Sequence, residues 1–177
     1  MHWFKKLLFI IATLSCASYV AAQEFMSPLS ENTLGNSVGK SDTVVLDVYK
    51  SPSCQCCSKW IHHVEAFNFE AETHHPDNIT LVKERVGVPK GYYACHTSVT
   101  KDGRVFEGHI PAKLIRRYLM KQPKDTIGLT VKGMPLGSPG MNVGGRFSPY
   151  KIYLIHKNGS VSEYEDVKLF TQQYDIE

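Results

Sequence analysis

The spacing of apolar residues changes along the first part of the chain and marks out successive strands and helices. Residues 43–49 are rich in valine and predict a β-strand. Apolar side chains then recur every three or four residues from Cys57 to Phe67, which predicts a helix that begins at Cys56 or Cys57, with Ser53 as its candidate N-cap. The same analysis predicts a strand at 69–73, a helix at 79–86, a hairpin at 97–100 and 104–107, and a helix opened by Pro111.

The resulting order, β-α-β-α-β-β-α, is that of thioredoxin-like and glutaredoxin-like domains, and its β-α-β start favours a mixed sheet with helices on its faces. Residues 123–149 are rich in glycine and proline, so we expect a long loop there, of the kind that usually has a function. Residues 150–156 and 161–164, around Asn158-Gly159, predict a final β-hairpin. The predicted fold class is α/β: a thioredoxin-like mixed sheet flanked by helices, with a Gly/Pro/Met-rich loop and an added C-terminal β-hairpin.

The N-terminal segment has the composition of a cleavable secretory signal. Lys5-Lys6 form a basic region, residues 7–14 an apolar core, and Val20-Ala21-Ala22 a small-residue cleavage site. The apolar core is far shorter than the roughly 20 residues that a membrane span needs, and we expect no span in the mature chain. We therefore predict a signal peptide at 1–22, a disordered leader at 23–40 and one domain at 41–177, with acylation of Cys16 as an alternative.

The net charge of the chain bears on its binding partners, and its length bears on the number of domains. The 177 residues carry a formal net charge of +3. Cleavage after Ala22 removes two lysines and no acidic residue, so the mature chain is nearly neutral. A nearly neutral surface argues against nucleic acid as a partner, and the remaining length suits a single domain with a sizeable core.

Three cysteines crowd into four residues, Cys54-Gln55-Cys56-Cys57. Cys54 and Cys57 have the C-x-x-C spacing of thioredoxin-like redox sites, which leaves Cys56 over. A third thiol is redundant for dithiol chemistry, but it is useful to a soft ion such as Cu(I), which prefers thiolate and thioether ligands. The N-terminus of a helix favours the thiolate form needed by a nucleophile and a metal ligand alike. The Cys-x-Cys-Cys motif therefore predicts a metal site first and a dithiol second.

The predicted topology adds further candidate ligands. It brings the turn before the third strand, with Cys95 and His96, beside the three clustered cysteines. His109 follows the predicted hairpin and is a candidate ligand, or a candidate to hold one. Met134 and Met141 lie in the predicted loop, where thioethers either complete a copper site or pack the loop onto the domain. His62 and His63 lie on the predicted helix, too far along its axis to share a metal with Cys56, and we expect them to face solvent.

Five ordered motifs together resemble a known family. They are Tyr49-Lys50-Ser51-Pro52 leading into Cys54-x-Cys56-Cys57, then Cys95-His96-Thr97, Glu107-Gly108-His109-Ile110-Pro111, Gly133-Met134-Pro135 and Gly137-Ser138-Pro139-Gly140-Met141. These residues resemble the family of small exported bacterial proteins, long catalogued as a domain of unknown function, that includes the copper-resistance protein CopG. The resemblance runs from about Val44 to about Gly159, and Gln55 stands where the family usually has Gly. It implies a thioredoxin-like fold, a periplasmic setting, copper bound by the Cys-x-Cys-Cys segment with the downstream cysteine, and a role in interconverting Cu(I) and Cu(II).

The predicted function is that of a periplasmic copper-binding protein of copper resistance. We expect it to hold Cu(I) at a multinuclear thiolate site, to act as a copper oxidoreductase, and to exchange copper ions with other periplasmic copper-handling proteins. Two alternatives remain. A thiol-disulfide oxidoreductase that uses Cys54 and Cys57 leaves Cys56, Cys95 and the methionines unexplained. A structural zinc site would accept four thiolates, but zinc normally takes its ligands from two separated pairs.

Overall fold

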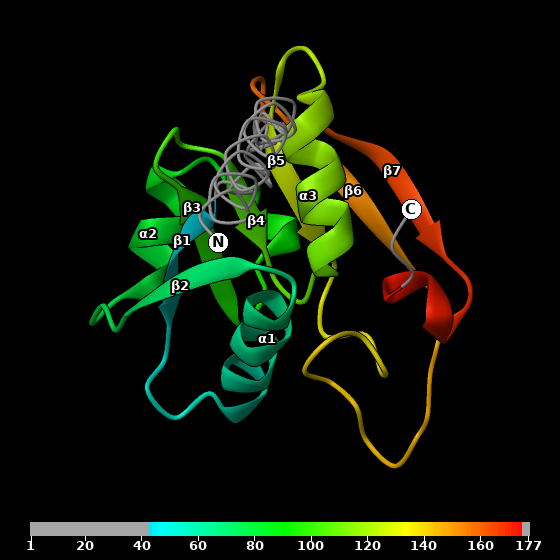
Figure 1. The fold of residues 1–177 in the computed structure, drawn as a ribbon. Coiled ribbons are helices and arrows are strands. Elements are labelled where there is room, and N and C mark those ends of the chain that lie inside the picture. Colours follow the sequence, from blue (N-terminus) through cyan, green and yellow to red (C-terminus); the bar gives the residue numbers. More distant parts are fainter. Residues whose placement is uncertain (1–42, 175–177) are drawn as a thin grey trace, which may run out of the picture. The chain divides into compact units, whose positions relative to one another are not determined.

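A seven-stranded mixed β-sheet is the framework of residues 43–174, the part of the chain that the computed structural model describes (Figure 1). Across the sheet the strands are β2 (Phe69–His74), β1 (Val44–Lys50), β3 (His96–Thr100), β4 (Val105–Glu107), β5 (Thr126–Val131), β6 (Tyr150–His156) and β7 (Val161–Val167). The pairs β1–β2 and β4–β5 are parallel and the other pairs antiparallel. The order β2-β1-β3-β4, with β3 antiparallel to both neighbours, confirms the thioredoxin-like α/β fold. The signal peptide, the leader and Cys16 lie outside the described residues.

Helices cover both faces of this sheet. They are α1 (Gln55–Ala66), α2 (Ile79–Arg85) and α3 (Ala112–Lys121), with short 3-10 turns η1 (Lys90–Tyr92) and η2 (Phe170–Gln173). Neighbouring residues of a strand point to opposite faces. Phe106 packs edge-on against Tyr118 of α3, whereas the next residue, Glu107, pairs with Lys83 of α2. The helices α3 and α2 therefore lie on opposite faces, and Figure 1 shows α1 on the same face as α3.

The main hydrophobic core lies between the sheet and the helices α1 and α3. Its fully buried side chains include Leu46, Val48, Trp60, Val64, Phe106, Ile110, Ile115, Tyr118, Leu129 and Ile152. Trp60 adds a polar tie, because its indole Nε1 donates a hydrogen bond of 2.8 Å to the carbonyl oxygen of Ile110. The core thus fixes the start of α1 against the segment that connects β4 to α3. None of the helices in residues 43–174 is long and apolar enough to cross a membrane.

The helix starts differ in detail from the sequence prediction. The N-cap of α1 is Cys54, not Ser53, and it makes no side-chain capping bond. The Ser53 hydroxyl instead lies 3.0 Å from that of Ser51. Asn78 caps α2 by accepting hydrogen bonds from two backbone N–H groups, and Pro111 is the N-cap of α3 rather than its first residue. The starts of α1 and α3 thus differ from the prediction by one or two residues, α2 begins at residue 79 as predicted, and the order of elements is as predicted.

The prediction of a continuous loop at 123–149 is wrong in its first part, because residues 126–131 form β5. Most of the glycines and prolines on which the prediction rested lie after this segment, from Gly133 onward, and the strand itself contains one glycine, Gly128. A Cβ on Gly128 would lie 1.7 Å from the carbonyl oxygen of Val105 on β4, so only glycine fits where the two strands meet. The loop proper spans residues 132–149. The predicted C-terminal hairpin is present as β6 and β7, and with β5 it extends the sheet by three strands.

Candidate metal centre

The N-terminus of α1 carries three of the four cysteines. Strand β1 ends at Lys50, and a short turn, in which Cys54 N–H donates to the Ser51 carbonyl at 3.1 Å, leads into the helix. Cys54 and Cys56 are partly exposed, whereas Cys57 is fully buried against the core. The helix start therefore presents two accessible sulfur positions and one enclosed position.

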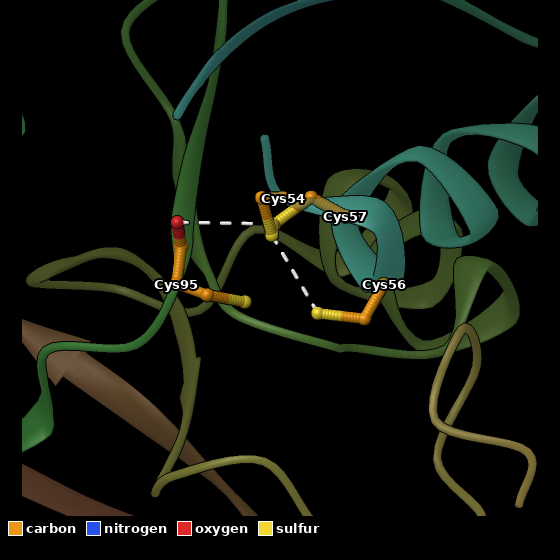
Figure 2. A group of neighbouring side chains, drawn as sticks. All are labelled: Cys54, Cys56, Cys57 and Cys95. Carbon is orange, nitrogen blue, oxygen red and sulfur yellow. Dashed lines mark hydrogen bonds between the residues drawn. A yellow bond between two sulfur atoms is a disulfide. The ribbon is translucent and has the colours of Figure 1, made fainter. Parts of the chain in front are cut away.

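Cys54 and Cys57 are joined by a disulfide, and Cys56 and Cys95 are free thiols (Figure 2). The Cα atoms of the bonded pair are 5.4 Å apart, as expected for a C-x-x-C pair on the first turn of a helix. Cys56 Sγ lies only 3.5 Å from Cys54 Sγ. Figure 2 shows the side chains of Cys56 and Cys95 pointing toward each other beside the disulfide.

Cys95 reaches this cluster because β3 pairs with β1. Lys50, the last residue of β1, lies opposite His96 in the antiparallel register, so the turn before β3 is held beside the start of α1. The carbonyl oxygen of Cys95 lies 3.9 Å from Cys57 Sγ. The sulfur atoms of Cys54, Cys56, Cys57 and Cys95 all lie within 4.8 Å of one another. The predicted gathering of four sulfurs from two distant segments is therefore present.

The Cys95 thiol is protonated when no metal is bound. Burial raises the pKa of Cys95 from its usual value of 9.0 to about 12, and the neighbouring Cys56 raises it further in the same direction. A metal ion that binds Cys95 must displace its proton, which couples metal affinity to pH.

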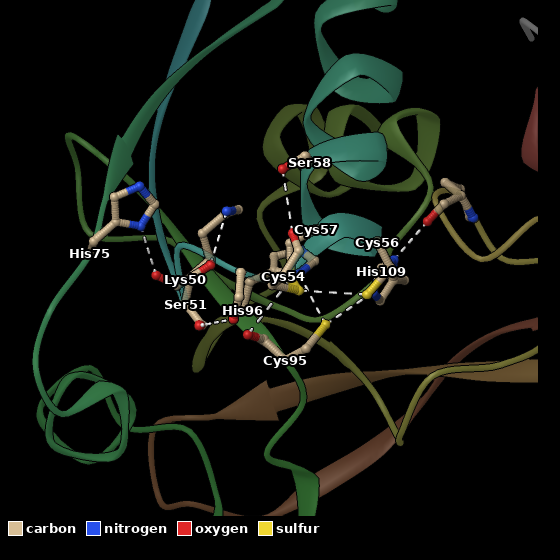
Figure 3. The surroundings of a disulfide bond; sticks show 12 residues. Lys50, Ser51, Cys54, Cys56, Cys57, Ser58, His75, Cys95, His96 and His109 are labelled. Atoms are coloured by element: carbon tan, nitrogen blue, oxygen red, sulfur yellow. Dashed lines mark hydrogen bonds between the residues drawn. A yellow bond between two sulfur atoms is a disulfide. The ribbon is translucent and has the colours of Figure 1, made fainter.

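His109 is oriented by the loop that follows β5. Its Nδ1 lies 2.7 Å from the carbonyl oxygen of Pro139, and since a carbonyl only accepts, Nδ1 carries the proton and donates it (Figure 3). Burial lowers the pKa of His109, against the raising effect of this hydrogen bond, so the ring is neutral near pH 7. The lone pair on Nε2 is then free to face Cys95 Sγ, 3.0 Å away. It is positioned to accept a hydrogen bond from the thiol, and the same lone pair could hold a metal ion that replaced the thiol proton.

His96 brings a second imidazole to the same place. The ring is fully buried between Trp60 and His109, with ring centroids 4.3 Å and 5.0 Å away. Burial lowers the pKa of His96 well below its usual value, so it too is neutral. Its Nδ1 lies 3.5 Å from Cys95 Sγ, and among the described residues its Nε2 has no hydrogen-bond partner. Cys95, His96 and His109 thus form a second set of donors within 4.8 Å of one another.

The loop 132–149 packs directly onto the cysteine site. A Cβ on Gly140, whose φ is +84°, would lie 2.6 Å from the carbonyl oxygen of Cys56, so the loop backbone rests on the first turn of α1. The C-terminal segment holds the loop there, because the amide of Gln173 donates to the Gly137 carbonyl at 3.1 Å. Met141 follows Gly140 and is partly buried, whereas Met134 is 52 % exposed. The loop therefore contacts the site through Gly140, next to Met141 in the sequence, and the assignment of the two methionines as ligands stays a prediction.

A buried ion pair supports the Cys95 segment from the other face of the sheet. Glu107, at the end of β4, is fully buried and accepts hydrogen bonds of 2.6 Å from Lys83 Nζ and from the backbone N–H of Ala94. Its other oxygen accepts from the Thr97 hydroxyl at 2.6 Å, and that hydroxyl accepts from Lys83 at 2.8 Å. Burial raises the pKa of Glu107, while Lys83 holds it down. The carboxylate therefore clamps the residues on both sides of Cys95 and His96.

Sequence reasoning gave these residues no role in the site. The sequence feature that could have indicated the buried pair is a lone acidic residue, Glu107, directly after the apolar residues Val105-Phe106.

The prediction that His63 faces solvent is wrong. The ring is largely buried, its pKa is lowered by burial to about 4, and its Nε2 accepts a 3.0 Å hydrogen bond from the N–H of Ala112. His62 is exposed, as expected. The lysine, the glutamate and the buried histidine all fix the positions of elements around the cysteines.

Comparison with known proteins gives one consistent result. A family model described as a protein of unknown function, DUF411, matches residues 92–141, which contain Cys95, both site histidines and both loop methionines. Two solved structures titled copper resistance protein copG, forms 1 and 2, are similar to this chain at 36 % and 37 % identity and TM-scores of 0.66 and 0.65. The matches cover 72 % and 70 % of this chain and 99 % and 98 % of the solved chains. The curated proteins contain no match.

Proposed function

Because this chain belongs to the family of the copper resistance protein CopG, we propose that it is an exported protein that binds Cu(I) in the periplasm and contributes to copper resistance. The observation that carries the proposal is the gathering of four cysteine sulfurs within 4.8 Å of one another. Reduction of the Cys54–Cys57 disulfide would make all four available as thiolates. Soft thiolates select Cu(I), and at this separation they can bridge several ions rather than enclose one.

The neighbouring imidazoles extend the proposal to both oxidation states of copper. His109 Nε2 and His96 are neutral and lie beside Cys95, so they offer nitrogen donors to an ion that the cysteine also binds. Imidazole is a good ligand for Cu(II), whereas thiolates favour Cu(I). A site with both donor types supports interconversion of Cu(I) and Cu(II), and hence a copper oxidoreductase.

We assign Met141 and Met134 as thioether ligands that close the site from the loop. Gly140 rests on the first turn of α1, which brings the backbone of the adjacent Met141 to the same part of the site. Met134 is half exposed and would have to reach the cysteine sulfurs by a movement of the loop. Thioethers are soft and uncharged, so they would favour Cu(I) over Zn(II) without adding charge.

The second candidate function is a thiol-disulfide oxidoreductase. The observation that favours it is the Cys54–Cys57 disulfide at the start of α1 in a thioredoxin-like fold. An oxidoreductase of this kind gives no role to Cys56, Cys95 or the two site histidines, although Cys95 lies within 4.8 Å of Cys56 and of both histidines. We therefore place it second.

The test is an anaerobic Cu(I) titration of the fully reduced mature protein against a chromogenic chelator, with X-ray absorption on the loaded protein. We expect more than one Cu(I) per chain, sulfur in the first coordination shell, and a lower number of bound ions in Cys56→Ser. Ser53→Ala is the matched control, because Ser53 is exposed and only its hydroxyl contact to Ser51 is lost. The double variant Met134→Leu/Met141→Leu should weaken Cu(I) retention and leave zinc affinity unchanged.

Three results would contradict the proposal. Saturation at one ion, unchanged in Cys56→Ser, would replace the multinuclear site by a mononuclear one. Retention of Cu(I) unaltered in the methionine variant would return both side chains to simple packing. Insulin reduction at the rate of a thioredoxin, together with full activity in Cys95→Ala, would favour the oxidoreductase.

A further inference from the structure

The four cysteines divide into two chemically different pairs. Cys54 and Cys57 are bonded to each other, whereas Cys56 and Cys95 remain thiols although Cys56 Sγ is 3.5 Å from the same Cys54 sulfur. The bonded pair occupies one turn of α1 at a Cα separation of 5.4 Å, which a disulfide bridges without movement of the backbone. The fold therefore accommodates the site both as four thiols and as one disulfide with two thiols.

Oxidation of the first pair leaves a set of copper ligands intact. Cys95 Sγ has His109 Nε2 at 3.0 Å and His96 Nδ1 at 3.5 Å, and Cys56 lies within 4.8 Å of Cys95. His109 is held in this orientation by the hydrogen bond from its Nδ1 to the Pro139 carbonyl, 2.7 Å away. When Cys54 and Cys57 are no longer available, Cys95 still links two donor sets: the sulfur of Cys56 on one side and the nitrogens of His96 and His109 on the other.

Resting on the copper function proposed above, we propose that the Cys54/Cys57 pair is an internal two-electron donor that reduces Cu(II), while Cys56, Cys95 and His109 keep the copper. Each of two Cu(II) ions takes one electron. The thiols of Cys54 and Cys57 lose two electrons and two protons, and one S–S bond forms. The products are two Cu(I) ions, the disulfide and two protons, and all atoms and charges balance.

The difference in burial indicates how the donor is restored. Cys57 is fully buried and Cys54 is partly exposed, so an exported dithiol reductant reaches the disulfide at Cys54 Sγ. Its thiolate bonds to Cys54, and Cys57 leaves as a thiolate that takes up a proton beside the Cys95 carbonyl, 3.9 Å away. The second thiol of the reductant then displaces Cys54, which also becomes a thiol. The reductant leaves as a disulfide, so it has been oxidised by two electrons and the Cys54/Cys57 pair has been reduced by two.

The experiment starts from fully reduced, metal-free mature protein freed of added thiol by gel filtration under anaerobic conditions. Two equivalents of Cu(II) are added, and the reaction is followed by the loss of the Cu(II) electron paramagnetic resonance signal. Free thiols are then alkylated in denaturant, disulfides are reduced and alkylated with a second, heavier reagent, and fragmentation mass spectrometry assigns each label. We expect two Cu(I) per chain, the second label on Cys54 and Cys57, and the first label on Cys56 and Cys95.

Variants separate the two roles. Cys54→Ser/Cys57→Ser should reduce Cu(II) at least tenfold more slowly. It should also bind fewer Cu(I) ions than the reduced wild type, because only Cys56, Cys95 and the site histidines remain as ligands. Cys95→Ser should still form the Cys54–Cys57 disulfide but lose Cu(I) faster to a competing chelator. Ser53→Ala should match wild type in both measurements.

Three outcomes overturn the inference alone. The first two are Cu(II) that stays unreduced in a protein that binds Cu(I) normally, and a disulfide that contains Cys56 or Cys95. Reduction by the Cys54→Ser/Cys57→Ser variant at the wild-type rate would also overturn it. Failure of the reduced wild-type protein to bind Cu(I) at all would instead refute the copper function on which the inference rests.

Discussion

The buried ion pair of Lys83 and Glu107 can be tested directly for its role in positioning the segment that carries Cys95 and His96. Their side chains are 3 % and 0 % exposed. Lys83→Met keeps an unbranched side chain of similar length but removes the only cation bonded to the Glu107 carboxylate within residues 43–174. Breaking a buried pair on one side costs about 3–5 kcal/mol, because it leaves an uncompensated buried charge. That is a large part of the roughly 5–15 kcal/mol that stabilises a typical domain.

Urea unfolding at pH 7 measures this loss as a lower midpoint at unchanged slope. The double variant Lys83→Met/Glu107→Gln should be more stable than the single variant, since it buries no charge and the amide oxygen still accepts from Ala94 N–H. The matched control is Lys151→Met, which breaks the Lys151–Glu163 pair. That pair has the same 2.6 Å separation but is about half exposed, so its loss should cost only about 0–1 kcal/mol.

The pH dependence of the unfolding free energy in Lys83→Met is a second, independent test of the buried pair. Lys83 lowers the pKa of Glu107, so in Lys83→Met this pKa rises further above that of the unfolded chain, about 4.3. Between the two pKa values the folded variant binds a proton that the unfolded chain does not, and its stability relative to wild type falls as pH rises. A deficit below about 1 kcal/mol, a double variant no better than the single one, or a deficit independent of pH would refute the reasoning.

Two further predictions follow from the loop and the helix. In Gly140→Ala the new Cβ meets the Cys56 carbonyl, so we expect the loop to move away from α1, with a lower melting temperature and weaker Cu(I) retention. The control is Gly144→Ala, which is also at positive φ but has open space around it, and which should lose only the roughly 1 kcal/mol of backbone strain. Equal effects of the two substitutions would contradict the contact between Gly140 and Cys56. The folded pKa of His63, about 4, lies below its unfolded value of 6.5, so wild-type stability should fall as pH drops through this window. His63→Gln, which keeps an acceptor for Ala112 N–H, should show a shallower fall between pH 7 and pH 5, and an unchanged slope would refute it.

The parts of the site that the sequence predicts are those set by local pattern and by topology. The C-x-x-C spacing places Cys54 and Cys57 on one helical turn whatever surrounds them. Cys95 could be placed beside them because β3 must pair with β1 once the β-α-β start is recognised. In both cases a rule of chain geometry connects the residue to the site, so no knowledge of packing is needed.

The missed features depend on contacts between segments that are distant in sequence. Gly128 looked like a loop residue because the strand that excludes its side chain, at Val105, lies more than twenty positions earlier. Lys83 and Glu107 each read as ordinary charged positions, since nothing local shows that α2 and β4 bury them against each other. The position of His63 on its helix predicts an exposed side chain, and only the contact with the N-terminus of α3, where Ala112 N–H donates to the ring, buries it. Pairings of this kind are decided by tertiary packing, which outweighs local preference.

Charge balance in the buried site connects the cysteines, the ion pair and the choice of metal. Without metal the centre is nearly neutral, because burial keeps the Cys95 thiol protonated and both imidazoles uncharged. Each Cu(I) that replaces one thiol proton leaves the net charge unchanged. One Zn(II) on four thiolates would instead leave a net charge of −2, which the buried Lys50 opposite His96 would offset only in part, since Lys83 is already paired with Glu107. Burying an unbalanced charge is costly, so the surroundings that protect the cysteines also favour several monovalent ions over one divalent ion.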